Sequence, residues 1–273
     1  MDFGLNEQQE MLQKSAREFL SDVYSDKILA QMAKEPRGYS DDMWNKMSEL
    51  GWMALSISEE YGGIGDFLDL TLVLKEMGRA GFISPYFSTM VLGASLLTEA
   101  GSPEQKQKHL SAISEGRQKV TLAWNEEPAD YSAAAIKTPI KTAGENFIIS
   151  GRKLLVPDAG SADYLICAFR TSQQISSEEG VTLFIIDAKT KGITCNPLDT
   201  ISPDKYDEVI FDQVIVKPHS VLGEIGQGWP VLQKVFDKAA AAACSVMLGG
   251  EERVLDLTVT YAKDRTAFGH PIG

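Results

Sequence analysis

The last thirteen residues, YAKDRTAFGHPIG at positions 261–273, interrupt a long helical pattern. The pattern predicts one helix over residues 229–263, and the run of alanines Ala239–Ala243 strongly favours it. The pair Gly249-Gly250 lies inside this helix, where it would kink the helix or admit a neighbouring helix at close range. After Arg265 an aromatic residue, a glycine and a Pro-Ile pair end the pattern. The stretch therefore marks a long helix followed by the start of a new segment.

Upstream of this helix the chain divides into a helical region and a β-rich region. The helical region comes first and contains three signals for the start of a helix. They are a capping box at Asn6 and Gln9, an N-cap at Ser40, and a second capping box at Ser102 and Gln105. From about Lys119 the helical pattern gives way to β-rich runs separated by turn residues, namely VTLAW, NFIIS, KLLV, YLICAF, VTLFIID and EVIFDQVIV. Runs this short with turn residues between them suggest an antiparallel sandwich or barrel.

The order of helices, then strands, then helix predicts an α+β fold rather than alternating βαβ units. We expect an all-α domain over residues 1–118 and a β domain over residues 119–226. The first long helix of a further helical domain would follow over residues 227–273. In the final β run, Val209 and Phe211 would face away from Val214 and Val216 unless a bulge intervenes.

Composition excludes several classes of protein. The 273 residues carry a net charge of −12, which makes nucleic-acid binding improbable. The three cysteines and three histidines lack metal-site spacing, and the odd number of cysteines suggests a reducing compartment such as the cytoplasm. The N-terminus is unlike a signal peptide, and no apolar run reaches the ~18 residues that a membrane span needs.

Two glycine clusters invite a nucleotide-binding interpretation. One is YGGIG at residues 61–65, and the other is GEIGQG at residues 223–228. Neither has the G-x-G-x-x-G spacing, and no parallel βαβ unit surrounds them. We therefore interpret both as turns and exclude a Rossmann-type dinucleotide site.

Several motifs, taken in order, resemble those of one known family. In the helical region they are Leu5–Gln9, Glu49–Gly65, Lys75–Ala80 and Gly101–Gly116. In the β region they are Glu127-Pro128 and Ser150–Thr171, followed before the long helix by Val221–Gly223 and Gly226–Gly228. The final motif consists of Tyr261, Arg265, Phe268-Gly269 and Pro271-Ile272. In this order and spacing the whole chain resembles the acyl-CoA dehydrogenases, a family of FAD-dependent flavoproteins.

The resemblance implies a fold, a cofactor, a reaction and partners. FAD would lie between the β domain and a C-terminal helix bundle, held partly by a neighbouring subunit. In the implied reaction a glutamate takes the α-proton of an acyl-CoA thioester, and the β-hydrogen leaves as hydride to the flavin. Hydrogen bonds to the thioester carbonyl would acidify the α-carbon. The implied partners are an electron-transferring flavoprotein and a related dehydrogenase chain in a homo- or hetero-oligomer.

No residue of the chain matches the catalytic base of the family. The usual glutamate lies beyond the Arg-x2-Phe-Gly motif, and this sequence ends first. Some members place the base early on the long helix, at the position of Ala239, and alanine cannot accept a proton. Glu251 and Glu252 lie farther along the same helix, where we expect a solvated face.

The flavin motifs depart from the family pattern in the β domain. Glu126 to Ser132 replace a Thr-Glu-Pro motif and its glycine turn, and Glu126 and Asp130 would add negative charge near the cofactor. Leu155-Val156-Pro157 replace Trp-Ile-Thr, which removes a stacking aromatic, a hydroxyl and a backbone N–H. We expect Trp124 to pack in the core. These changes predict weak or absent flavin binding by the chain's own β domain.

Arg265 and Phe268, in contrast, match the family and would reach the FAD of a neighbouring subunit. Arginine suits a pyrophosphate because its fork is permanently charged and makes two hydrogen bonds. The competing interpretation is a surface arginine and a core phenylalanine, while His270 is most simply a loop residue. The complete set of cofactor-binding candidates is Asn125, Glu126, Ser132, Leu155, Val156, Pro157, Arg265 and Phe268.

Our leading interpretation is an acyl-CoA dehydrogenase-family subunit that depends on a second chain, or on a missing C-terminal segment, for its base. Such chains occur in fatty acid or steroid side-chain catabolism. One alternative is a truncated dehydrogenase that exposes Val246, Leu248, Leu255 and Val259 on the long helix. The others are a structural or regulatory subunit without its own flavin site and, less favoured, a flavin oxidase or monooxygenase.

Overall fold

The computed structural model describes residues 4–128, 130–171 and 178–273. The first part of the chain is helical, and both predicted capping boxes form, at Asn6 with Gln9 and at Ser102 with Gln105. The Ser40 side chain caps a third helix by accepting the N–H of Met43. The α-helices are α1 (Glu7–Val23), α2 (Asp26–Lys34), α3 (Asp41–Glu49), α4 (Phe67–Ala80), α5 (Ala94–Ala100) and α6 (Pro103–Ser114). Short 3-10 turns η1 (Trp52–Ala54) and η2 (Glu59–Tyr61) and the π-helical segment η3 (Phe87–Gly93) complete this part.

The middle part folds into two four-stranded sheets. One has the order β1-β4-β5-β8 and the other the order β2-β3-β7-β6. The strands are β1 (Val120–Ala123), β2 (Ile140–Ala143), β3 (Asn146–Pro157), β4 (Tyr164–Arg170), β5 (Val181–Asp187), β6 (Ile193–Leu198), β7 (Tyr206–Val216) and β8 (Val221–Leu222). Short 3-10 turns are η4 (Ala133–Ala135), η5 (Ala159–Ser161) and η6 (Pro218–Ser220).

The predicted sandwich therefore forms, with differences in detail. The runs NFIIS and KLLV belong to the single strand β3, and the pairing of β1 with β4 is parallel rather than antiparallel. β2 and β6 were not predicted, because their side chains are mostly exposed or half-buried and leave no continuous apolar run. In β7 the exposed pair Asp212-Gln213 lies opposite Ser150 as a bulge, so Val209, Phe211, Val214 and Val216 are all buried.

The β1-β4-β5-β8 sheet is the central layer of the molecule. One of its faces, with Leu122, Ile166 and Leu183, packs in one core with the N-terminal helices and the start of α7 (Gly228–Asp264). The other face, with Cys167 and Phe184, packs against the second sheet. Strands β4 and β5 are consequently buried almost throughout and read as uninterrupted apolar runs.

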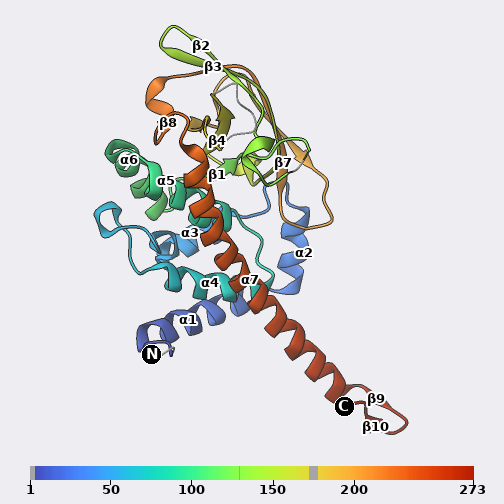
Figure 1. Cartoon of the computed structure of the whole chain (residues 1–273). Helices are drawn as coiled ribbons and strands as arrows, with labels where there is room; N and C mark the ends of the chain where they lie inside the picture. The colour runs from blue at the N-terminus through green and yellow to red at the C-terminus, as the bar shows by residue number, and fades with distance from the viewer. Residues whose placement is uncertain (1–3, 129, 172–177) are drawn as a thin grey trace.

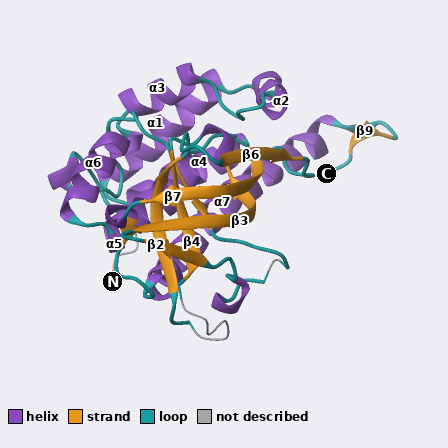
Figure 2. Cartoon of the chain, turned by 90° about the horizontal axis from the view of Figure 1, so that it is seen from above, coloured by secondary structure: helices purple, strands orange, loops and turns teal. Residues whose placement is uncertain are grey.

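The long helix α7 crosses α4 at very close range. A Cβ on Gly249 would lie 1.8 Å from the carbonyl oxygen of Lys75, and one on Gly78 would lie 1.9 Å from that of Val246. The glycine pair thus admits a neighbouring helix, as predicted, and α7 continues unbroken through it. Beyond the crossing α7 projects away from the body and ends in the small hairpin of β9 (Thr266–Ala267) and β10 (His270–Pro271) (Figures 1 and 2).

Candidate functional site

The structure brings the two predicted middle-domain segments together. Asn125 and Glu126 follow β1, and the irregular end of β3 runs beside them. The N–H of Leu154 donates to the carbonyl oxygen of Asn125 at 2.9 Å. The Thr121 hydroxyl donates to the carbonyl oxygen of Pro157 at 2.6 Å. Residues separated by about thirty positions in sequence therefore form one edge of the middle domain, which periodicity alone does not predict.

Glu126 forms a buried ion pair with Lys153. Lys153 Nζ lies 2.5 Å from Glu126 Oε1, and its side chain is completely buried. The Glu126 carboxylate also accepts the N–H groups of Lys137 at 2.9 Å and of Thr138 at 3.0 Å. Burial lowers the pKa of Lys153, and the charge of Glu126 opposes that shift. The negative charge expected from Glu126 is thus compensated within the protein, by a lysine that the sequence pattern does not distinguish.

The end of β3 presents its three predicted residues in three different directions. A second bulge separates the pairings of Lys153 and Val156 with β7, and Leu155 adopts a φ of 52°. Leu155 is 43% exposed, whereas Val156 lies in the core between the sheets. Pro157 has no N–H to donate, and its carbonyl oxygen already accepts from Thr121. The carbonyl oxygens of Asn125 and Pro157 at this edge are therefore both already bonded within the protein.

Aromatic side chains pack beside this edge. The Trp124 ring lies 4.8 Å from that of Phe236 and 5.9 Å from that of Tyr131, measured between centroids. Trp124 is partly buried against the main core, as expected from the sequence. Ser132 immediately precedes η4 and is half-buried. The backbone atoms of η4 are held by Arg170, whose guanidinium donates to the carbonyl oxygen of Ala133.

A cavity of about 480 Å³ lies at the junction of all three parts of the chain. We call it the junction cavity. Its walls come from α4, η3, the end of β3, the loop at residues 203–206 and α7, and Pro157 is the predicted site residue that lines it. Apolar side chains such as Leu74, Phe87 and Val246 form much of its lining. A cavity of this size and character can hold a small organic ligand.

Asp158 supplies a carboxyl group to the junction cavity. Its Oδ2 accepts a hydrogen bond of 2.6 Å from the hydroxyl of Ser88, which is buried. Burial raises the pKa of Asp158 to about 7, and the nearby charges of Asp204 and Asp207 act in the same direction, while Ser88 opposes them. Nothing in the sequence pattern distinguishes Asp158, since an aspartate in PDAGS is typical of an ordinary turn.

Arg265 and Phe268 lie far from the other predicted residues. Arg265 ends α7, and Phe268 is fully exposed in the turn of the terminal hairpin with a φ of 55°. Figure 1 shows this hairpin at the tip of the projecting helix, away from the middle domain. The structure thus brings Asn125 and Glu126 beside the end of β3 and separates Arg265 and Phe268 from them.

Two expectations for α7 are wrong. Val246 is not exposed but packs partly buried against the main core, because α4 approaches closely there. Glu252 does not belong to a purely solvated face, since it pairs with Lys75 at 2.7 Å and with Arg17 at 3.8 Å. Glu251 is exposed, as expected. The other large apolar side chains on this part of α7 are exposed, namely Met247, Leu248, Val254, Leu255, Leu257 and Val259.

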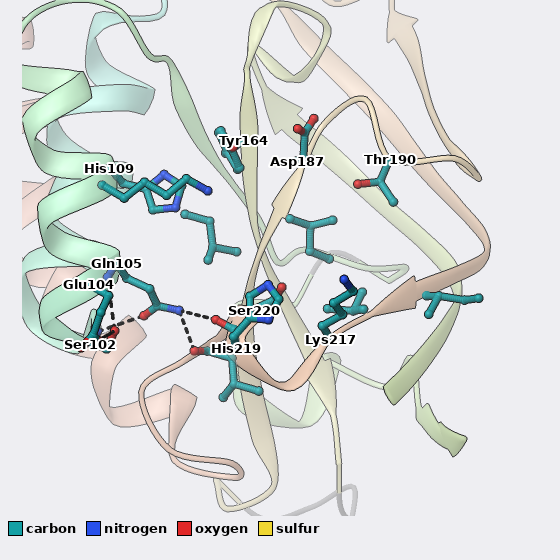
Figure 3. Close-up of a pocket in the computed structure, with 16 residues that line it drawn as sticks. Ser102, Glu104, Gln105, His109, Tyr164, Asp187, Thr190, Lys217, His219 and Ser220 are labelled. Atoms are coloured by element: carbon teal, nitrogen blue, oxygen red, sulfur yellow. Dashed lines mark hydrogen bonds between the residues drawn. The ribbon is translucent and has the colours of Figure 1, made fainter. Parts of the chain in front are cut away.

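A second cavity, of about 780 Å³, lies between α6 and the β domain and includes none of the predicted site residues (Figure 3). Gln105 spans one side of it, donating to the carbonyl oxygens of His219 at 3.0 Å and Val221 at 2.9 Å. His109 is buried there beside Gln118, and burial lowers the pKa of its ring to about 4. The Gln105 contacts fasten α6 to the β domain, and burial keeps His109 uncharged at neutral pH.

Neither a metal site nor a membrane helix is found in residues 4–128, 130–171 and 178–273. No group of three or more His, Cys, Asp or Glu residues in these ranges is arranged to hold a metal ion. Nor does any helix in them combine the length and apolarity that a membrane crossing requires.

Family models match the chain along most of its length. The N-terminal domain model of the acyl-CoA dehydrogenases matches residues 6–117, the middle domain model residues 121–214, and the C-terminal domain model residues 226–273. The described elements agree with this division, because α6 ends before residue 117 and α7 begins after residue 226.

Individual relatives give the same result. The short-chain specific acyl-CoA dehydrogenase of Clostridium acetobutylicum is 28% identical over 280 residues, which cover 100% of this chain and 73% of that protein. A subunit of the caffeyl-CoA reductase–Etf complex of Acetobacterium woodii is 27% identical over 274 residues, covering 98% of this chain and 72% of the subunit. The solved structure of butyryl-CoA dehydrogenase from Megasphaera elsdenii has a TM-score of 0.91 at 25% identity and covers 100% of this chain, against 73% of its own.

Proposed function

We propose, on the premise that this chain belongs to the acyl-CoA dehydrogenase family, that it is one subunit of an FAD-dependent enzyme acting on an acyl-CoA thioester. In this proposal the catalytic base comes from outside residues 1–273, either from a partner chain or from further sequence. The reaction class is removal of hydrogen from the α- and β-carbons of the acyl group, or the reverse reduction.

The junction cavity is the observation that carries this proposal. It lies where the three matched domains meet, and it is bounded by Pro157, one of the residues that the family resemblance predicts to lie at the flavin. Its apolar walls suit the acyl part of a thioester. The cavity therefore offers a place for the substrate beside the position at which the reaction would take place.

The middle-domain residues themselves fit a flavin poorly. Pro157 has no N–H, and the Glu126 carboxylate is already bonded to Lys153 and to two backbone N–H groups. Leu155 replaces a stacking aromatic with an exposed aliphatic side chain. A flavin at this edge would therefore lack the stacking aromatic and the backbone donor that the family pattern supplies. The contribution of this chain to an FAD site would instead be Arg265 and Phe268, offered to a neighbouring subunit.

The exposed half of α7 supports dependence on an outside segment. Three of its exposed apolar side chains, Leu248, Leu255 and Val259, fall on one face of the helix, and that face is largely uncovered within the described residues. An uncovered apolar face of this kind is typical of an interaction surface. Glu252, just beyond the crossing with α4, is held in ion pairs with Lys75 and Arg17 and is therefore a poor candidate for a free base.

The test is to purify the chain from its native source with whatever it binds, and separately to purify residues 1–273 alone. We expect the complex to contain FAD and a segment or chain related to the family, and butyryl-CoA to bleach its flavin absorbance. The isolated chain should contain little flavin. If the isolated chain binds FAD stoichiometrically and oxidises butyryl-CoA, the need for an outside base is refuted.

The second candidate function is a structural or regulatory subunit that has lost its own flavin site. The buried pair of Glu126 with Lys153 favours it, because a group that touches a cofactor in the family is here committed to holding the protein together. A purified complex whose flavin is bound and reduced equally well without this chain would support this alternative. An electron-transferring flavoprotein as partner, a role in fatty acid or steroid side-chain catabolism, and a cytoplasmic location stay predictions.

A further inference from the structure

We propose that the junction cavity binds an apolar ligand or acyl group that carries a protonated amine, with Asp158 as the residue that recognises the amine. Ligand recognition of this kind belongs to the chain itself. It does not depend on flavin or on the identity of the catalytic base, so it can be tested on residues 1–273 alone.

The chemistry of the cavity walls is the first argument. Leu74 and Phe87 from the N-terminal part and Val246 from α7 give apolar contact. Asp158 places a carboxyl group among them. A purely hydrocarbon ligand would gain nothing from the Asp158 carboxyl group and would remove water from it. A ligand with a cationic end would gain a charge-assisted hydrogen bond in surroundings of low polarity.

The bonding of Asp158 is the second argument. Its Oδ2 accepts from Ser88, which can donate only one proton and also lies 3.1 Å from the carbonyl oxygen of Pro85. Within the described parts of the chain, no side chain forms an ion pair with Asp158. One carboxylate oxygen is therefore left for a ligand.

The groups that surround Asp158 favour a cation rather than an anion. Asp204 and Asp207 raise its pKa, and both are acidic. Lys205 also lines the cavity, but its ammonium group donates to the carbonyl oxygen of Ala33, at the C-terminal end of α2, at 2.7 Å. The helical walls contribute Ser88 from η3 and apolar side chains from α7. An ammonium group would relieve the repulsion among these carboxyl groups, whereas a carboxylate ligand would increase it.

The experiment compares 4-phenylbutylamine with 4-phenylbutanol, which have the same apolar body and differ in the terminal group. We would measure the affinity of each by isothermal titration calorimetry at pH 8, where Asp158 is mostly ionised, and at pH 5.5, where it is mostly protonated. The amine should bind about tenfold or more tightly than the alcohol at pH 8, in line with a charge-assisted hydrogen bond. The preference should largely disappear at pH 5.5.

Variants assign the preference to this residue and this cavity. Asp158→Asn keeps the size of the side chain and should abolish the preference for the amine while leaving alcohol binding nearly unchanged. Asp199→Asn, which makes the same exchange at an exposed position outside the cavity lining, is the control and should keep the preference. Ala243→Phe, which projects into the cavity from α7, should weaken both ligands.

Three results would overturn the proposal. The amine and alcohol could bind equally at pH 8, Asp158→Asn could keep the preference, or a folded Ala243→Phe variant could bind both ligands like the wild type. If Ala243→Phe does not fold, the comparison of Asp158→Asn with Asp199→Asn still decides the question. Absence of flavin from the complex purified from the native source would count against an FAD-dependent role and leave this test unaffected.

Discussion

Replacing Glu126 by glutamine should destabilise the protein strongly, because it removes the counter-charge of a fully buried ammonium group. Lys153 Nζ lies 2.5 Å from Glu126, and the Lys153 side chain has no exposed surface. Breaking a buried pair by removing one partner typically costs 3–5 kcal/mol. Glutamine keeps one acceptor oxygen for the N–H groups of Lys137 and Thr138. We therefore expect a loss of about 3 kcal/mol in the free energy of unfolding, at the lower end of that range.

The adjacent residues supply a matched control. Arg152 pairs with Glu127 one position along both segments, but these side chains are 56% and 66% exposed. Exposed pairs contribute about 0–1 kcal/mol, so Glu127→Gln should change stability by less than about 1 kcal/mol. The two substitutions alter the same chemical group in the same part of the chain. Their difference therefore isolates the effect of burial.

The assay is urea unfolding followed by circular dichroism and tryptophan fluorescence, with agreement between the two probes as the check on two-state behaviour. A Lys153→Met substitution in the Glu126→Gln background should restore part of the lost stability, since it removes the unpaired ammonium group. The reasoning is refuted if Glu126→Gln costs no more than Glu127→Gln. It is also refuted if the double variant is as unstable as the sum of the single variants.

Three further predictions concern the helix crossing, a buried histidine and the terminal hairpin. Gly249→Ala should lower the free energy of unfolding by about 1–3 kcal/mol in urea, because its Cβ would lie 1.8 Å from the carbonyl oxygen of Lys75. Gly250→Ala is the control. It should be neutral or stabilising, because the nearest atom to its Cβ is 3.8 Å away. Because the pKa of His109 is lowered from 6.5 to about 4, the stability due to this group is complete above pH 6.5 and is lost as the pH falls toward 4, by about 3 kcal/mol. His109→Gln should flatten that acid dependence in unfolding curves between pH 7 and 4, and an unchanged slope would contradict the assignment. Arg265→Ala should lower the FAD content of the purified complex, and unchanged content with unchanged salt sensitivity would refute a cross-subunit role.

The sequence predicted those features that depend on local chemistry. The capping boxes at Asn6 and Ser102, the long helix over residues 229–263 and the order of helices and strands all follow from propensity and periodicity. The close approach of a helix at Gly249 could also be predicted from the sequence, because a glycine pair lowers the stability of a helix and is typical of a close backbone contact. These features are set by residues near one another along the chain.

The features that sequence reasoning missed depend on pairs of distant residues. Lys153 lies in the run KLLV, where a lysine normally marks an exposed position, and only the fold shows that Glu126 neutralises it in the core. Asp158 is likewise an ordinary turn residue in the sequence. Only the fold brings the hydroxyl of Ser88, seventy positions away, into a hydrogen bond with it. A departure from the family pattern at one position therefore says little about the local charge or the exposure of that residue. The residue that contacts it in the fold must also be known.

The geometry of α7 determines how the two groups of candidate residues can act together. Its last buried residue is Gly249, and Arg265 follows at the far end of the same unbroken helix. At 1.5 Å per residue, that separation is about 24 Å, directed away from the body of the protein. Arg265 and Phe268 cannot turn back to the edge formed by Glu126 and Pro157 without breaking the helix. A ligand that needs both groups must therefore take them from two different chains, which makes any complete site of this kind a property of an assembly.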